Sequence, residues 1–313
     1  MTISFARQAV VITGAGGGLG RAYALEVARR GGMVVVNDLG GATNGAAGGE
    51  STSFADKVVN EIREAGGTAV ANYDSVSTTE GGRAIIQSAL DAFGRIDAVV
   101  ANAGTMRYGQ FEDLTLEDLT ALFAVHVGGS WTVAQAAWPH MKAQGYGRIV
   151  FTTSSGGTLG NAYLAAYGTA KGGVMGLMHN LAEAGAPHGI LCNALMPNAL
   201  SRMTSTIQPG ELGENPWGTK LGQYFDPFYT AGLVAYLASN ACETHHGIYS
   251  MLGGRVGRAF IGICDGIADD MPLSADVIAA NWAAINDDRA GYTIPLHNTD
   301  EWRIVAEQRG IGT

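Results

Sequence analysis

Two side chains of different chemistry lie four residues apart in the segment AYLAAYGTAKGG, residues 162–173. On a helix, this spacing places Tyr167 and Lys171 on one face, so that the lysine ammonium lies close to the tyrosine phenol. A free phenol titrates near pH 10, and a neighbouring positive charge favours its ionised form. We therefore expect Tyr167 to exchange a proton at neutral pH, with Lys171 lowering its pKa.

A serine thirteen residues upstream completes the candidate catalytic group. Ser154 ends an apolar run, residues 147–154, that is typical of a buried strand. Open α/β sheets bind ligands beyond the carboxyl ends of their strands. The Ser154 hydroxyl is thus expected to hold the substrate oxygen that Tyr167 protonates or deprotonates.

The segment VITGAGGGLGRAYA, residues 11–24, places Gly14, Gly18 and Gly20 between a predicted strand and a predicted helix. Glycines there let backbone N–H groups and the helix N-terminus approach a pyrophosphate. Asp38 follows at the end of the second predicted strand, as in the dinucleotide-binding fingerprint. Its carboxylate can accept hydrogen bonds from the adenosine ribose, whereas a 2′-phosphate would be repelled, and no Lys or Arg precedes Arg21 in the loop. The pattern favours NAD over NADP, and the cationic nicotinamide would also favour the Tyr167 phenolate.

Short apolar runs alternate with segments of helical period along the chain. This alternation predicts βαβ units in a doubly wound, Rossmann-type parallel sheet of about seven strands, in the order 3-2-1-4-5-6-7, with helices on both faces. The strands are expected at residues 9–13, 33–38, 68–73, 96–104, 147–154 and 189–197, and the helices around residues 21–32, 54–67, 84–95 and 118–145.

Two segments depart from this alternation. Residues 40–53 are so rich in Gly, Ala and Ser that we expect a mobile loop. Near the end of the chain, a helix is expected to begin at Ser274 in SADVIAANWAAI.

Composition excludes several classes of protein. A net charge of -9 argues against nucleic acid as a partner, and no apolar run is long enough to span a bilayer. The three cysteines, Cys192, Cys242 and Cys264, have no metal-ligand spacing, so we expect reduced thiols and no metal site. We expect a soluble, cytoplasmic protein.

These motifs resemble the short-chain dehydrogenase/reductase family over essentially the whole chain. The similar segments are TGAGGGLG (13–20), ANAG (101–104), Ser154 with YGTAK (167–171), and MPNALSRMT (196–204). The resemblance implies hydride transfer to or from a nicotinamide, with Asp74 near the adenine, Asn102 bracing the site and Lys171 bonding the nicotinamide ribose. It implies cofactor contacts at Gly14, Gly18, Leu19, Gly20, Asp38, Asp74, Ser75, Asn102, Ala103, Gly104, Tyr167, Lys171, Pro197 and Asn198.

A narrower resemblance is to the (3R)-hydroxyacyl-CoA dehydrogenase domain of type-two peroxisomal multifunctional enzymes, also called 17β-hydroxysteroid dehydrogenases of type four. It rests on segments such as ADKVVNEIREAGGTAVANYDSV (55–76), AAWPHMK (136–142) and NALMPNALSRMT (193–204). Where the wider family has a catalytic Asn, this chain has His126, which either takes part in proton relay or is a hydrogen-bonded core residue. The hydratase and sterol-carrier modules of the multifunctional enzymes are absent, so a stand-alone dehydrogenase is expected.

The resemblance implies one catalytic domain, residues 1–313, with a core over 1–254 that includes a substrate lid at 199–229, and an extension over 255–313. The lid has two cations, Arg202 and Lys220, and five aromatic residues. This composition suits a flat apolar substrate, so we expect a hydroxysteroid ahead of a (3R)-hydroxyacyl-CoA, although Arg255 and Arg258 could bind phosphate. A non-catalytic NAD-binding protein is a third alternative. By resemblance, the chain forms a homodimer or homotetramer.

Overall fold

The computed structural model describes residues 2–40, 52–199, 220–269, 272–297 and 299–309. The chain divides into two compact units, residues 1–258 and 259–313, and each is treated by itself. Residues 41–51 of the expected mobile loop and residues 200–219 of the expected lid lie outside the described residues. The assignment of all 313 residues to one catalytic domain stays a prediction.

The larger unit contains an eight-stranded sheet in the order β3-β2-β1-β4-β5-β6-β7-β8. The predicted order is confirmed, with one strand more than expected. The extra strand, β8, follows β7 through a two-residue turn at Gly253 and Gly254, whose φ angles of 56° and 81° are those that a tight hairpin requires. The strands are β1 (Ala9–Thr13), β2 (Met33–Asn37), β3 (Thr68–Asn72), β4 (Ala98–Ala101), β5 (Gly147–Thr152), β6 (Ile190–Asn198), β7 (Ile248–Leu252) and β8 (Arg255–Ala259).

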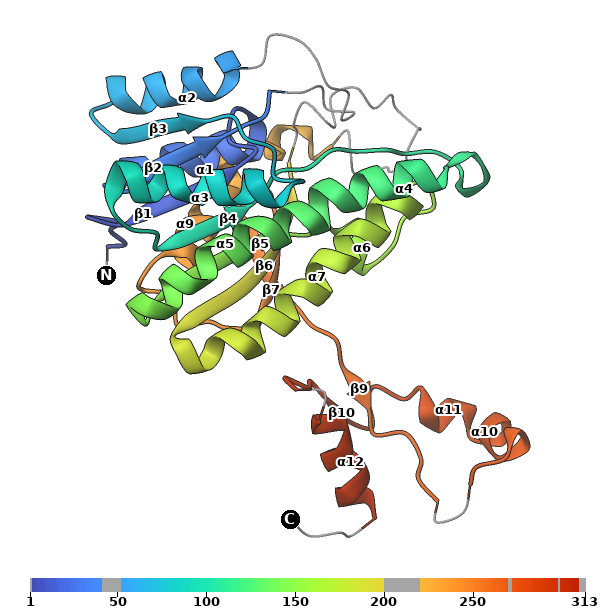
Figure 1. Cartoon of the computed structure of the whole chain (residues 1–313). Coiled ribbons are helices and arrows are strands. Elements are labelled where there is room, and N and C mark those ends of the chain that lie inside the picture. The colour runs from blue at the N-terminus through green and yellow to red at the C-terminus, as the bar shows by residue number, and fades with distance from the viewer. Residues whose placement is uncertain (1, 41–51, 200–219, 270–271, 298, 310–313) are drawn as a thin grey trace. The chain divides into compact units, whose positions relative to one another are not determined.

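The central strands are buried on both sides because helices cover both faces of the sheet (Figure 1). One layer contains α1 (Gly18–Arg29), α2 (Thr52–Glu64) and α9 (Phe228–Ala238), which share a core cluster with alternate residues of the strands. The other layer contains α3 (Thr79–Phe93), α5 (Gly129–Gln144) and α7 (Ala165–Gly185). The continuous Val and Ile runs of β1, β2 and β4 therefore reflect burial on two sides rather than amphipathic alternation.

The helix predicted over residues 118–145 is interrupted. It begins as α4 (Leu116–Phe123), where the Thr115 hydroxyl accepts a hydrogen bond from the Asp118 N–H. It then widens into a π-helical turn at Ala124–Gly128 before continuing as α5. A π turn inserts one residue into the helical repeat and is frequent at functional sites. Here it contains His126.

The smaller unit is built from short elements: α10 (Ala275–Ala280), α11 (Trp282–Ile285), α12 (Asp300–Gln308) and the antiparallel pair β9 (Ile263–Cys264) and β10 (Tyr292–Thr293). The expected helix start is confirmed, because the Ser274 hydroxyl accepts a hydrogen bond from the Val277 N–H at 3.3 Å. The helix does not run on to residue 285, since it ends at Asn281 and restarts as α11.

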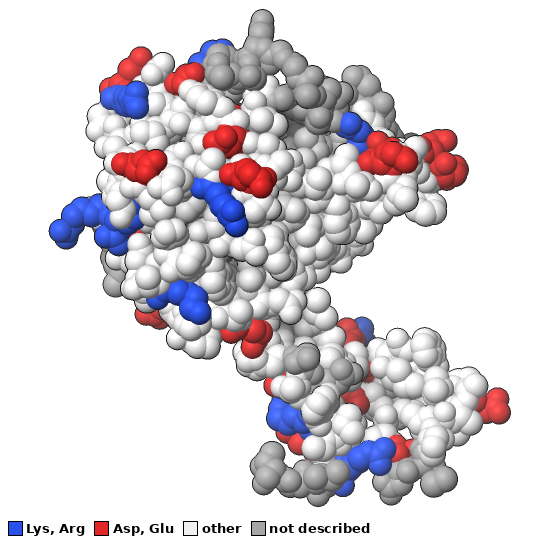
Figure 2. All heavy atoms as spheres, viewed as in Figure 1, with Lys and Arg blue, Asp and Glu red and all other residues white. Residues whose placement is uncertain are grey.

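On the face shown in Figure 2, several Lys and Arg residues lie beside Asp or Glu, and no extended basic patch is visible. No helix of the described residues is long and apolar enough to cross a bilayer. The exclusion of nucleic acid and membrane partners stays a prediction.

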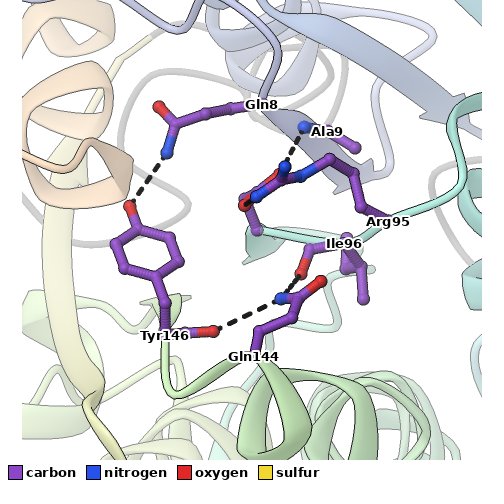
Figure 3. A network of polar contacts seen from close by, with 7 residues as sticks. Gln8, Ala9, Arg95, Ile96, Gln144 and Tyr146 are labelled. Carbon is purple, nitrogen blue, oxygen red and sulfur yellow. Dashed lines mark hydrogen bonds and ion pairs between the residues drawn. The ribbon is translucent and has the colours of Figure 1, made fainter.

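A polar network lies at the edge of the sheet where β1 and β4 begin (Figure 3). Asp97 is 1% exposed. Its carboxylate accepts hydrogen bonds from the Ala9 N–H at 2.8 Å and from the Arg95 guanidinium at 2.6 and 2.7 Å. The contact with Ala9 joins the start of β1 to the start of β4. The Gln8 amide donates to the Tyr146 hydroxyl at 3.1 Å. This edge is opposite the carboxyl ends of the strands, so the network stabilises the fold rather than the candidate site.

Arg148 extends this network into the interior. It is 7% exposed and stacks on the Tyr146 ring, with 4.4 Å between the guanidinium carbon and the ring centre. Its N–H groups donate to the carbonyl oxygens of Gly147, Gly189, Ser239 and Cys242. No carboxylate of the described residues forms an ion pair with it, so the four carbonyl dipoles and the Tyr146 ring stabilise this buried charge.

Replacing Arg148 should therefore destabilise the protein strongly. Arg148→Met fills similar volume but leaves buried carbonyl oxygens without donors, and we expect the free energy of unfolding to fall by about 3 kcal/mol. Urea unfolding measures this change. Arg29→Met removes an exposed guanidinium from an ion pair with Glu26 and should cost less than about 1 kcal/mol; equal losses in the two variants would contradict the argument.

Candidate active site

The three residues predicted to do chemistry meet at the carboxyl end of β5. Ser154 lies two residues beyond the strand and its hydroxyl hydrogen-bonds with Tyr167. Lys171 reaches back from α7 to the strand, where its ammonium donates to the carbonyl oxygen of Thr152 at 2.6 Å. The Lys171 Nζ lies 5.7 Å from the centre of the Tyr167 ring. Tyr167 is 7% exposed and Lys171 is 4% exposed.

Glycines position Ser154 against Tyr167. Ser154 caps the short helix α6 (Ser155–Thr158) by accepting a hydrogen bond from the Gly156 N–H at 3.1 Å. A Cβ added at Gly157 would lie 2.7 Å from the Lys171 Cβ, and one added at Gly168 would lie 2.6 Å from the Gly156 carbonyl oxygen. Helices α6 and α7 thus pack backbone against backbone, which fixes the distance from Ser154 to Tyr167 without an intervening side chain.

Burial outweighs charge in setting the protonation of the pair. It raises the pKa of Tyr167 to about 12, and the hydrogen bond with Ser154 opposes that rise only in part. It also lowers the pKa of Lys171 to about 7. The expectation that Lys171 lowers the Tyr167 pKa is wrong for the protein alone, because both groups are removed from water and each favours its neutral form.

His126 is enclosed beside this pair. Its ring lies edge-on to Tyr167, with 5.4 Å between ring centres, and it is 1% exposed. A Cβ added at Gly104 would lie 2.5 Å from the His126 Cε1, so the glycine makes room for the imidazole. Burial, followed by the charge of Lys171, lowers the His126 pKa well below its usual value.

The glycine loop forms the predicted turn between β1 and α1. Gly14 has φ of 62° and Gly18 has φ of 51°, in the left-handed region that favours glycine. A Cβ at Gly14 would lie 2.9 Å from the Ala103 Cα, and one at Gly20 would lie 2.3 Å from the Gly14 carbonyl oxygen. At these two positions the loop packs against the protein's own backbone. We expected glycine at these positions in order to let phosphate approach. In the structure, the glycines instead make room for the protein's own backbone.

Asn102 braces the loop as the resemblance implied. Its side-chain amide donates to the carbonyl oxygens of Thr13 at 2.9 Å and Gly14 at 3.3 Å. The Thr13 hydroxyl accepts hydrogen bonds from the N–H groups of Asn102 and Ala103, both at 3.0 Å. Together these contacts join the carboxyl ends of β1 and β4.

Asp38 lies directly after β2 and is 8% exposed. Its two carboxylate oxygens accept hydrogen bonds from the N–H groups of Gly16 at 2.9 Å and Gly40 at 2.8 Å. Arg21, the basic residue that directly follows the glycine loop, donates from its Nε to Glu61 at 2.9 Å. The Asp38 carboxylate is therefore held beside the glycine loop, while the Arg21 guanidinium pairs with Glu61.

The remaining predicted cofactor residues also lie at the carboxyl ends of strands or in the turns that follow them. Asp74 follows β3 and accepts a hydrogen bond from the Asn72 amide at 2.8 Å, and the Ser75 hydroxyl lies 2.8 Å from that of Ser77. Leu19 is in the first turn of α1, where no side chain caps the helix and no acidic residue is present. Pro197 and Asn198 are the last two residues of β6. Their contacts with a cofactor stay predictions.

These residues fit a dinucleotide. The N-terminus of α1 has no side-chain cap, and residues 16–19 are partly exposed, so its first backbone N–H groups can bind an anion. No cluster of three or more His, Cys, Asp or Glu among the described residues could hold a metal ion.

Sequence reasoning missed three threonines. Thr13 joins β1 to β4, Thr152 supplies the carbonyl acceptor for Lys171, and the Thr105 carbonyl oxygen lies 2.7 Å from the His126 Nε2. Thr13 belongs to the TGAGGGLG motif and could have been found from it. Thr152 and Thr105 act through their backbones, for which a side-chain motif gives no signal.

Comparison with known proteins decides the family. The sequence model of the short chain dehydrogenase family matches residues 8–211. A short-chain type dehydrogenase/reductase of Mycobacterium tuberculosis is 46% identical over 280 residues, which cover 90% of this chain and 94% of the relative. The chain belongs to the short-chain dehydrogenase family. It is thus an oxidoreductase related to enzymes that act on CH–OH groups, as its motifs predicted.

Within the short-chain dehydrogenase family, the chain is similar to part of larger enzymes. The peroxisomal multifunctional enzyme type 2 of Mus musculus is 44% identical over 288 residues, which cover 91% of this chain and 37% of the enzyme. The full-length Drosophila melanogaster structure of that enzyme superposes with a TM-score of 0.78 at 30% identity, covering 99% of this chain and 51% of that one. This chain therefore spans about a third to a half of these two relatives.

The contact between Gly157 of α6 and the backbone of α7 can be tested by substitution, with a second glycine of α7 as the control. Gly157→Ala places a methyl group against Lys171 and should move Ser154 away from Tyr167, lowering kcat/KM at least about tenfold while the circular dichroism spectrum is retained. Gly176 is also on α7, and a Cβ there meets nothing within 4 Å. Gly176→Ala should leave kcat/KM unchanged and stabilise the helix by about 0.5–1 kcal/mol.

The lowered pKa of Lys171 predicts a dependence of stability on pH. Between about pH 7 and its unfolded value of 10.5, Lys171 binds a proton in the unfolded chain but not in the folded one. The free energy of unfolding should therefore rise with pH in this window, by up to about 1.4 kcal/mol per pH unit. Urea unfolding of Lys171→Met should lack this rise. If both proteins showed the same slope, Lys171 would be charged in the folded state.

Proposed function

We propose that this chain is an NAD-dependent (3R)-hydroxyacyl-CoA dehydrogenase, which interconverts the 3-hydroxy and 3-keto forms of an acyl-CoA. The observation that carries the proposal is the 44% identity, over 91% of this chain, to the mouse peroxisomal multifunctional enzyme type 2. The segments quoted above resemble the (3R)-hydroxyacyl-CoA dehydrogenase domain of such enzymes. This likeness favours the acyl-CoA over the hydroxysteroid that we expected first.

The preference for NAD rests on Asp38. A carboxylate at the end of β2 suits the ribose hydroxyls of NAD and repels the 2′-phosphate of NADP. Arg21, the basic residue closest to the loop in sequence, is paired with Glu61 and is not directed to neutralise such a phosphate. The glycine loop and the first turn of α1 would hold the pyrophosphate.

The described side chains can perform both proton steps of alcohol oxidation. Ser154 holds the carbinol oxygen, and Tyr167 takes its proton as the C–H bond breaks. A bound nicotinamide would serve as the hydride acceptor and would bring positive charge to the site. Such charge, together with that of Lys171 when it is protonated, would oppose the burial that keeps Tyr167 protonated in the protein alone, so loading of the site would favour the base form. In ketone reduction Tyr167 returns the proton.

One observation favours a hydroxysteroid as the second candidate. Tyr224, Phe228 and Tyr229 belong to the last part of the predicted lid, and each is 39–50% exposed. The Tyr224 and Tyr229 rings lie 6.3 Å apart between centres. Exposed aromatic rings near one another suit a flat apolar ligand. An acyl-CoA requires cations as well, and Arg255 and Arg258 on β8 are exposed candidates for its phosphates.

A homodimer or homotetramer is part of the proposal, on the resemblance to the family alone. A cytoplasmic location stays a prediction, since the names of several relatives describe them as peroxisomal.

The assay that tests the function compares substrates and cofactors directly. Purified protein should reduce NAD with a (3R)-hydroxyacyl-CoA at a kcat/KM at least about tenfold above that with the (3S) isomer, 17β-estradiol or testosterone, and above that with NADP. Higher rates with a steroid would select the second candidate. No turnover with any substrate, together with NAD binding, would favour a non-catalytic NAD-binding protein.

Tyr167→Phe isolates the proton transfer. Removal of the phenol oxygen should lower kcat about 1,000-fold, with NAD affinity close to that of the unaltered protein. Stopped-flow absorbance measures turnover, and fluorescence titration measures NAD binding. Tyr236→Phe on α9, which packs at the edge of the core, is the matched control. Full turnover by Tyr167→Phe would remove the basis of the mechanism.

A further inference from the structure

The glycine loop, the Asp38 carboxylate and the start of α2 meet at one point. A Cβ added at Gly16 would lie 2.7 Å from the Asp38 Oδ2 and 2.7 Å from the Phe54 Cβ. Phe54 belongs to the first turn of α2 and is half-buried. An apolar side chain is therefore a direct neighbour of the carboxylate that we expect to meet the adenosine ribose.

That carboxylate is fixed in place from two sides. Its Oδ2 accepts a hydrogen bond from the Gly16 N–H and its Oδ1 accepts one from the Gly40 N–H, at 2.9 and 2.8 Å. Since Asp38 is also buried, it has little freedom to turn away from a group that approaches it. A phosphate on the ribose hydroxyl beside this carboxylate must therefore extend over the residues that surround Asp38.

These surroundings offer a phosphate few partners. Leu39, directly after Asp38, is an apolar side chain that is 56% exposed. The Arg21 guanidinium is paired with Glu61. A phosphate group carries a charge of about −1.5 to −2 at neutral pH, and it loses water wherever an apolar group covers it.

A lysine on α2 is held by Phe54 itself. Lys57 is exposed, and its Nζ lies 5.6 Å from the centre of the Phe54 ring. At this distance the face of the ring attracts the ammonium. Phe54 thus meets the glycine loop and the Asp38 carboxylate at its Cβ, and a basic side chain at its ring.

We propose that Phe54 is a specificity-determining residue of the cofactor site, which disfavours the 2′-phosphate of NADP by keeping an apolar side chain beside Asp38. The ribose of NAD has a hydroxyl in place of the phosphate, so it can bond with the carboxylate without displacing Phe54. Selection by an apolar neighbour adds to the repulsion by Asp38, because the two act through desolvation and through charge. The inference rests on the preference for NAD in the proposed function.

Three substitutions separate these contributions. Asp38→Asn removes the repulsion and keeps the apolar neighbour. Phe54→Ala then removes the ring in that background. Lys57→Met is present in both proteins, so that an ammonium released from the ring cannot bind the phosphate itself. Titration of the protein's fluorescence with NADP and with NAD gives each Kd without any turnover.

In the Asp38→Asn/Lys57→Met background, Phe54→Ala should lower the Kd of NADP about five- to tenfold and change the Kd of NAD by less than about twofold. Phe54→Leu keeps an apolar side chain and should change the Kd of NADP by less than about twofold. An unchanged Kd of NADP in Phe54→Ala, an equal gain for NAD, or equal gains in Phe54→Ala and Phe54→Leu would overturn the proposal.

A second variant covers the case in which Phe54→Ala does not fold. Phe54→Arg keeps a long side chain on α2 and replaces the apolar surface with a guanidinium. In the same background it should lower the Kd of NADP at least about tenfold. An unchanged Kd of NADP in a folded Phe54→Arg protein would equally refute the assignment.

Tyr73→Phe is the control for movement of α2. The Tyr73 hydroxyl donates to the Asp56 Oδ1 at 2.6 Å, which joins α2 to the end of β3. Its removal loosens the helix and leaves the Phe54 side chain intact, so neither Kd should change by more than about twofold. A gain in NADP affinity equal to that of Phe54→Ala would assign the preference to the position of the helix and would contradict the proposal.

These measurements distinguish the inference from the proposed function. A lack of dehydrogenase turnover, or tighter binding of NADP than of NAD by the unaltered protein, would count against the proposed function. The effect of Phe54→Ala on the Kd of NADP would still decide the role of Phe54, because it is read from binding alone.

Discussion

Removal of Tyr167 and Lys171 from water is the constraint on which the candidate site depends. A phenol and an amine placed side by side in solvent would each keep close to their ordinary proton affinity. In the interior where α6 packs on α7, burial moves the two pKa values apart, that of Tyr167 up to about 12 and that of Lys171 down to about 7, and disfavours charge on both groups. The pair is therefore poised to respond to any additional positive charge that enters the site.

The fold provides this enclosure through backbone packing at the carboxyl edge of the sheet. Thr13 and Asn102 join β1 to β4, and the Thr152 carbonyl oxygen fixes the Lys171 ammonium to β5. At the opposite edge, Asp97 accepts a hydrogen bond from the Ala9 N–H within the network of Figure 3, and Arg148 donates to the Ser239 carbonyl oxygen. Stability and chemistry thus depend on different ends of the same strands, and a substitution at one end need not disturb the other.

Much of the arrangement could be predicted from the sequence because periodicity and motif spacing are local signals. The strands near residues 9–13, 33–38 and 68–73, the strand order and the meeting of Ser154 with Tyr167 are of this kind. The π turn around His126 could not be predicted, since one inserted residue barely alters helical period. Nor could the dominance of burial over the Lys171 charge, because desolvation depends on what covers a group and not on its neighbours in sequence.

The direct contact between α6 and α7 separates two tasks that many binding sites combine. Where two backbones touch through glycine, almost no side chain is left to vary, so the reacting oxygen meets the same geometry whatever molecule carries it. Recognition of the rest of that molecule falls to other segments, such as the aromatic residues at 224–229. A lineage could then exchange one class of alcohol for another by altering those segments while inheriting the proton-transfer apparatus intact.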